Sequence, residues 1–205
     1  MSLAYLLRSR RAMLEELHGP PRRLDEDDGF TLIEMMLVVA VGIILAAMAI
    51  PVSGNFISTT RADSSILAVL DALETARDRS VAERRNFEVS FVNPNHIRVE
   101  RVEVPSGIKT LIADNVLENG QEFLTFAALP DTPDMFGAAA AIKFGGTAPW
   151  MFTSDGSWVD SNGDPVNGTV FLGVPNQPIT ARAVTVFGVT GLTRSWKWRG
   201  AQWFE

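Results

Sequence analysis

The chain has 205 residues and a formal net charge of −6, with 46% hydrophobic and 20% charged residues. These proportions are typical of a globular protein and exclude disorder along the whole length, and the negative charge excludes nucleic-acid binding through bulk positive charge. The absence of cysteine excludes a disulfide scaffold and thiolate chemistry, and two histidines, His18 and His96, are too few for a histidine-rich metal site.

Residues 1–29 form a polar segment that ends at Gly29 and contains five arginines and six acids. A secretory signal peptide would have a short apolar region before its cleavage site, whereas here the apolar run follows Gly29. The arginines favour a cytoplasmic N-terminus. We therefore expect residues 1–29 to be a leader peptide.

An apolar run follows, in which Glu34 is the only ionisable side chain between residues 30 and 60. As a helix, residues 30–50 would span about 31 Å, which matches the hydrocarbon core of a bilayer. The alternative, a buried core helix, is rarely apolar on all sides in a domain of this size. The pattern predicts a transmembrane half of a helix over residues 30–53, in which Pro51 removes a backbone donor and either kinks the helix or ends it at the membrane surface.

The segment GFTLIE at residues 29–34, followed by the apolar run, resembles the type IV prepilin processing motif. Type IV pilins and the pseudopilins of type II secretion systems share this motif. The resemblance implies that a prepilin peptidase cuts between Gly29 and Phe30 and methylates the new amine of Phe30. It also implies that Glu34 is the acid of the motif and that Pro51 is the helix-kinking proline of many members.

The chemistry of the residues fits these roles. Gly29 has no side chain, so a protease can approach the backbone closely. Placing the carboxylate of Glu34 in a membrane costs roughly 2.5–3.5 kcal/mol or more, so this group needs a partner. The positive amine of Phe30 on a neighbouring subunit is a natural one, and this pairing would set the register of a filament. The alternative for Glu34 is an interfacial acid without a specific partner.

Residues 54–85 show the pattern of an amphipathic helix. Apolar residues recur at helical spacing, and charged residues mostly fill the other positions. The apolar positions are Ile66, Val69, Leu70, Leu73 and Ala76. We expect one helix from Phe30 to about Glu83, with this stripe packed on a globular domain.

From residue 86 to 205 the pattern changes to the alternation of β-strands. Strand candidates begin with residues 87–91 and 97–104 and continue at 109–113, 122–127, 140–144, 149–153, 168–174, 180–188 and 192–199. Residues 128–139 and 154–167 are expected to be long surface loops. The predicted fold class is α+β: a long N-terminal transmembrane helix continues into an amphipathic helix that packs on an antiparallel sheet, as in type IV pilins.

The C-terminal third carries a second, less specific resemblance. Residues 152–156, 167–172, 181–186 and 190–198 are similar to the GspH/FimT group of minor pseudopilins and minor type IV pilins. This resemblance implies a periplasmic domain of that type over residues 86–205.

Asp160, Asn162 and Asp164 provide oxygen atoms at the first, third and fifth positions of a calcium-loop spacing. The complete motif would also need a glycine after Asp164 and a glutamate at its twelfth position, where the chain has Pro165 and Phe171. A solvated turn is the alternative to a calcium site.

The last forty residues are locally basic and rich in tryptophan, a combination that backbone-tracking DNA binding would need. Some FimT-type minor pilins use a Gly-Arg-x-Arg motif for DNA, and only Arg194 of that motif matches here. On a strand, Arg194 would share one face with the tryptophans, whereas Lys197 and Arg199 would lie on the other. The alternative is an edge strand with tryptophans packed on the core.

The sequence gives little support for an enzyme, because no nucleophile motif or phosphate loop accompanies the loop acids Asp155, Asp160 and Asp164. We expect no catalytic residues and no cofactor. The expected function is that of a minor pseudopilin at or near the tip of a type II secretion pseudopilus. The alternatives are a FimT/FimU-like minor pilin that contacts DNA and an unrelated single-pass membrane protein with an exported binding domain.

The expected partners are other pilin or pseudopilin subunits, prepilin peptidase, the inner membrane and the inner-membrane assembly platform. Nucleic acid is not expected to be a partner. The expected location is the inner membrane, with a single span, a cytoplasmic N-terminus and a periplasmic C-terminal domain.

Overall fold

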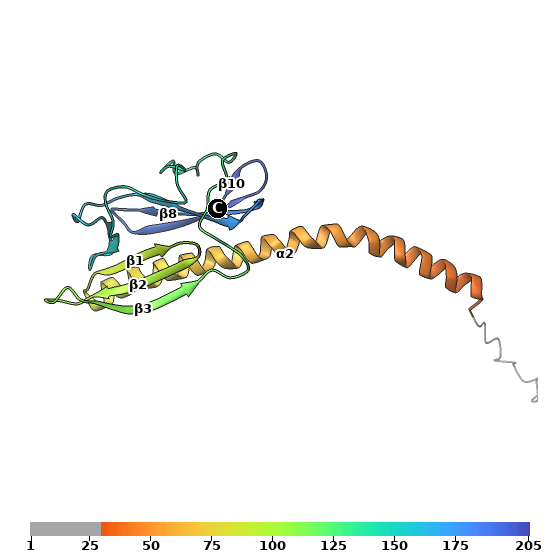
Figure 1. The fold of residues 1–205 in the computed structure, drawn as a ribbon, viewed down its shortest axis with the longest axis horizontal. Helices are drawn as coiled ribbons and strands as arrows, with labels where there is room; N and C mark the ends of the chain where they lie inside the picture. Colours follow the sequence, from red (N-terminus) through yellow and green to blue (C-terminus); the bar gives the residue numbers. More distant parts are fainter. Residues whose placement is uncertain (1–29) are drawn as a thin grey trace, which may run out of the picture. The chain divides into compact units, whose positions relative to one another are not determined.

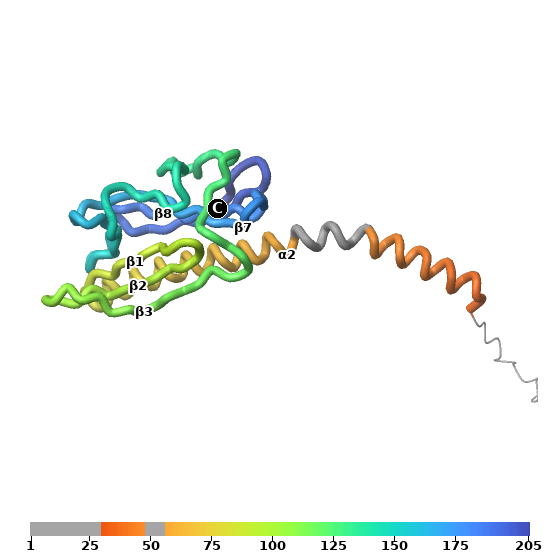
Figure 2. Tube along the Cα trace, in the orientation of Figure 1, coloured from red at the N-terminus to blue at the C-terminus, as the bar shows by residue number. Residues whose placement is uncertain are grey.

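The computed structural model describes residues 30–205, apart from the side chains of residues 48–55, and Figure 2 shows the remaining residues in grey. The predicted leader, residues 1–29, lies outside the described residues. The chain divides into two compact units, Met1–Met48 and Ala49–Glu205. A single helix, α2 (Leu32–Glu83), begins in the first unit and continues into the second.

The C-terminal end of α2 is set by local backbone geometry. Arg84 adopts a left-handed φ of 52°, and the Arg85 N–H donates to the Ser80 carbonyl at 3.2 Å. This bond is the outer one of a Schellman motif, which uses a carbonyl that the helix would otherwise leave unpaired. The chain turns there and enters its first strand at Phe87.

The inner face of α2 packs on the β-domain. Ile66, Val69, Leu73 and Ala76 are fully buried, and Leu70 is half-buried against the same core. The apolar stripe read from the sequence is therefore core packing.

The strands form two five-stranded antiparallel sheets. The first has the order β3-β2-β1-β5-β6 and the second the order β10-β9-β8-β7-β4. The bounds of the strands are β1 (Phe87–Val92), β2 (His96–Val102), β3 (Lys109–Val116), β4 (Ile142–Phe144), β5 (Met151–Phe152), β6 (Trp158–Val159), β7 (Gly168–Val174), β8 (Gln177–Phe187), β9 (Leu192–Trp198) and β10 (Trp203–Phe204). The predicted α+β class, a helix packed on antiparallel sheet, is confirmed.

The second sheet is covered on both of its faces. Its inner face shares the main core with α2 and the first sheet, where Val170, Val184 and Val186 are fully buried. On its outer face Trp196 and Trp203 form a smaller cluster with aromatic and aliphatic side chains of the segment between β3 and β4. Figure 1 shows this segment, in green and teal, crossing over β8.

Two sequence predictions about this domain are wrong. Residues 122–127 are not a strand but a loop with one bridge, between Glu122 and Gly173. Phe123 packs in the main core and Phe126 in the smaller cluster, so this segment passes around the edge of the sheet from one face to the other. Residues 154–167 are not a loop throughout, because they contain β6, whose Trp158 is fully buried.

Candidate functional site

The N-terminal end of α2 carries Phe30, Thr31 and Glu34. Phe30 is 70% exposed and precedes the helix. The Thr31 hydroxyl accepts a hydrogen bond from the Glu34 N–H at 3.3 Å, and the Thr31 carbonyl accepts one from the Met35 N–H at 3.1 Å. Thr31 is thus the N-cap, and a threonine followed three residues later by glutamate is a capping-box sequence. An amine created at Phe30 would lie immediately before this cap.

The structure describes only part of the predicted processing and membrane region. Gly29 lies outside the described residues, as does the side chain of Pro51. Among the residues that the structure describes, no helix combines the length and the apolarity needed to cross a membrane. Residues 48–53 of the predicted span fall in the range without described side chains, so the span and the kink stay predictions.

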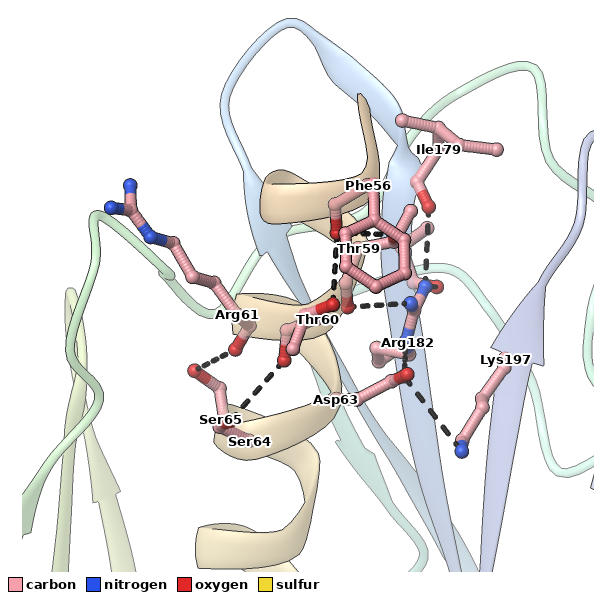
Figure 3. Close-up of polar contacts among 11 residues, drawn as sticks. Phe56, Thr59, Thr60, Arg61, Asp63, Ser64, Ser65, Ile179, Arg182 and Lys197 are labelled. Atoms are coloured by element: carbon pink, nitrogen blue, oxygen red, sulfur yellow. Dashed lines mark hydrogen bonds and ion pairs between the residues drawn. The ribbon is translucent and has the colours of Figure 1, made fainter. Parts of the chain in front are cut away.

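A buried arginine joins the second sheet to α2. The side chain of Arg182 on β8 is 3% exposed, and its Nε donates to the Asp63 carboxylate on α2 at 2.8 Å. Its other nitrogens donate to the carbonyls of Thr59, Ile179 and Ala181. Figure 3 shows Arg182 pointing from β8 at Thr59 and Asp63. The sequence analysis did not assign this role, although a charge on the same strand face as Val184 and Val186 was a usable signal.

A second arginine, Arg77 on α2, contacts two loops at once. Arg77 Nε donates to the Gly156 carbonyl at 3.3 Å, and Arg77 Nη2 donates to the Thr190 carbonyl at 3.0 Å. The loops come close here because Gly191 has no side chain: a Cβ atom at Gly191 would lie 2.0 Å from the Gly156 carbonyl oxygen. Two segments that the sequence analysis singled out, residues 152–156 and 190–198, thus meet at α2.

Residues 27–50 match the prokaryotic N-terminal methylation motif. The match covers the segment in which the sequence predicted a processing and methylation motif. Its matched residues include the exposed Phe30, the N-cap Thr31 and the exposed Glu34.

Two solved structures of the minor pseudopilin EpsH from the type 2 secretion system of Vibrio cholerae are similar to this chain. One has 14% sequence identity and a TM-score of 0.45, and covers 67% of this chain and 97% of its own. The other, a crystal structure, has 17% identity and a TM-score of 0.43, and covers 67% of this chain and 94% of its own.

The basic residues far from the methylation motif do not form one patch. Arg194 lies on the outer face of the second sheet, where its Nη1 donates to Asp134 at 3.2 Å and its guanidinium stacks on Phe187. Lys197 lies on the opposite face, with Nζ 3.8 Å from Asp63. Arg199 stacks on Phe204 beyond the end of β9. Arg194 and Lys197 thus lie on opposite faces, as predicted, and DNA contact by these residues stays a hypothesis.

The predicted calcium loop is built around Asp160. Its carboxylate accepts hydrogen bonds from the backbone N–H groups of Asn162, Asp164 and Thr147 and from the Asn162 side chain. Burial raises the pKa of Asp160, but these donors together lower it below its ordinary value. The described residues contain no group of three or more acids or histidines placed to hold a metal ion. Asp160 therefore has a structural role in closing the turn, and calcium binding stays a hypothesis.

Proposed function

We propose that this chain is the precursor of a minor pseudopilin, a non-catalytic structural subunit at or near the tip of a type II secretion pseudopilus. The observation that carries the proposal is the match of residues 27–50 to the methylation motif, at the start of a helix that continues into a β-rich domain. The function is assembly, so no cofactor is required.

Prepilin peptidase is the first partner under this proposal. It cuts between Gly29 and Phe30 and methylates the new amine of Phe30. The N-cap at Thr31 supports this role, because it starts the helix directly after the amine and leaves Phe30 exposed. Residues 30–53 then hold the subunit in the inner membrane, with the N-terminus cytoplasmic and residues 86–205 periplasmic.

Other pseudopilin subunits and the inner-membrane assembly platform are the later partners. The side chain of Glu34 is exposed at the start of α2, so it is available to the amine of a neighbouring subunit. Pairing neutralises both charges away from water and defines an axial register. Because Pro51 has no backbone N–H to donate, the helix can bend at this position when the subunit leaves the membrane.

Mass spectrometry of the mature chain tests the proposal. The full chain is expressed with an active prepilin peptidase and, in parallel, with a catalytically inactive one. We expect a chain that begins at Phe30 and carries one N-methyl group in the first case and the unshortened precursor in the second. A chain that keeps residues 1–29 with the active peptidase would contradict the proposal and favour an unrelated single-pass membrane protein.

A minor pilin of a type IV pilus would have the same N-terminus. Its proposed DNA contact gains no support from the described residues, because Arg194 is engaged by Asp134 and Lys197 lies on the other face of the sheet. Whether the neighbouring genes belong to a secretion or a pilus operon separates the two assignments.

A further inference from the structure

A basic hollow lies beside the buried Arg182. Its volume is about 310 Å³, and it opens between α2, β8 and the end of β9. Its polar and aromatic lining consists of Thr59, Asp63, Arg182, Lys197, Trp198 and Arg199. We call these residues the basic hollow. Figure 3 shows Arg182 and Lys197 both pointing toward Asp63 from the two neighbouring strands.

The charges of the basic hollow do not cancel. It contains three cations and one carboxylate, which leaves a formal excess of two positive charges. Asp63 is held by Arg182 at 2.8 Å, while Lys197 Nζ is 3.8 Å from the same carboxylate, beyond hydrogen-bond distance. Arg199 is exposed and contacts the ring of Phe204. Lys197 and Arg199 therefore have donors to offer to an anion, whereas Arg182 serves to hold the helix.

The position of the basic hollow along α2 indicates where the anion comes from. Thr59 follows the predicted membrane segment by six residues, which is about 9 Å of helix rise. Between them, Phe56 is 71% exposed and Ile57 is 48% exposed. Where a protein meets the headgroup region of a membrane, an apolar helix is typically followed by exposed apolar side chains and then by cations.

We propose that the basic hollow binds the phosphate group of an anionic phospholipid in the membrane that holds the N-terminal helix. Lys197 and Arg199 donate hydrogen bonds to the phosphate oxygens. The contact would hold the end of the β-domain on the membrane surface before the subunit is extracted. This inference rests on the membrane anchorage in the proposed function.

The test uses the full chain in nanodiscs made of phosphatidylcholine alone or of phosphatidylcholine mixed with phosphatidylglycerol. The measurement is the NMR shift of the Lys197 and Arg199 backbone amides as phosphatidylglycerol increases. We expect a saturable shift with phosphatidylglycerol only. The double variant K197Q/R199Q should weaken the apparent affinity at least about tenfold, because each cation near an anionic surface contributes on the order of 1 kcal/mol.

The control variant is K143Q/R79Q, which removes two exposed cations outside the basic hollow. Its affinity should equal that of the unchanged chain. An equal loss in both variants would overturn the proposal, because it would mean diffuse attraction by net charge. Equal shifts in phosphatidylcholine would overturn it as well, since the basic hollow would then not distinguish an anionic headgroup from a zwitterionic one.

Two further measurements complete the test. Inorganic phosphate should compete with the lipid, and a lack of competition would overturn the assignment of the phosphate as the recognised group. If K197Q/R199Q keeps lipid binding but loses cross-linking to other pseudopilins, the basic hollow is a protein-docking site and the proposal is wrong. Cleavage before Phe30 tests the proposed function separately, because neither Lys197 nor Arg199 belongs to the processing motif.

Discussion

Arg182 Nε on β8 and Asp63 Oδ1 on α2 are 2.8 Å apart, although 119 positions separate the two residues in sequence. The arginine is 3% exposed, whereas the aspartate is 40% exposed. The pair therefore joins a buried cation to an anion that still contacts water. The contact adds a polar link between α2 and the second sheet to the apolar packing that they share.

Asp63→Asn should lower the free energy of unfolding by about 2 kcal/mol, because it leaves the buried guanidinium without its counter-charge. Urea unfolding of the full chain in detergent measures this. Asp71→Asn is the control: Asp71 is exposed on the same helix, and its substitution should change the free energy by less than about 0.5 kcal/mol. Equal losses in both variants would show that the ion pair contributes nothing specific.

Gly191→Ala should destabilise the domain more than Gly163→Ala. Both glycines have a left-handed φ, 61° at Gly191 and 87° at Gly163, so each substitution costs about 1–2 kcal/mol in backbone strain. Only at Gly191 would the new methyl group also meet the Gly156 carbonyl, at 2.0 Å, and Arg77; nothing lies within 4 Å at Gly163. Thermal unfolding of the two variants side by side checks the order, and similar melting temperatures would contradict the close approach of the two loops.

The stability that Asp155 provides should depend on pH. Hydrogen bonds to its carboxylate from the Thr153 hydroxyl, and then from the N–H and hydroxyl of Ser157, lower its pKa from 3.8 to about 2. Because the pKa is lower in the folded state, the ionised group stabilises the fold above pH 3.8 and loses this effect as the pH falls toward 2.

Asp155→Asn should accordingly be less stable than the unchanged chain near neutral pH, and the difference should shrink between about pH 4 and pH 2. Unfolding experiments across this range measure it. Ser154→Ala is the control, since this exposed neighbour carries no titrating group and the variant should keep a constant difference. A difference for Asp155→Asn that does not change with pH would refute the prediction.

Asp134→Asn should release the segment between β3 and β4 from the outer face of the second sheet. The Asp134 carboxylate, 9% exposed, accepts bonds from the Thr185 hydroxyl at 2.6 Å, Trp196 Nε1 at 3.1 Å and Arg194 Nη1 at 3.2 Å. We expect a loss of about 2 kcal/mol and faster proteolysis within residues 128–139. Asp164→Asn, at an exposed position, should leave the cleavage rate unchanged.

Glu34→Ala should separate processing from assembly. The scissile bond after Gly29 is untouched, so the chain should still be shortened to Phe30, but the amine of a neighbouring subunit loses its counter-charge. The measurement is the amount of mature chain in purified filaments relative to that in membranes. Asp78→Ala, an exposed acid on the same helix, is the control. Normal incorporation of Glu34→Ala would contradict the proposed pairing.

Local patterns in the sequence were enough for the features that local physics controls. The GFTLIE segment and the apolar run after it predicted the methylation motif at residues 27–50. The spacing of Ile66, Val69, Leu73 and Ala76 predicted which side of α2 is buried. Alternation along β9 placed Arg194 and Lys197 on opposite faces. These features repeat with the period of a helix or a strand, which neighbouring residues are sufficient to define.

The tertiary structure alone decided the contacts between distant segments. Residues 122–127 read as a strand, but Phe123 and Phe126 fill two different cores, and this outweighs local β-propensity. Arg182 meets Asp63, Arg77 meets Gly156, and Asp134 meets Trp196 only because the helix, two sheets and a long crossing segment pack together. The basic hollow likewise combines α2, β8 and β9. A repeating pattern in the sequence does not predict these tertiary contacts, because they depend on how whole elements bury their apolar faces against one another.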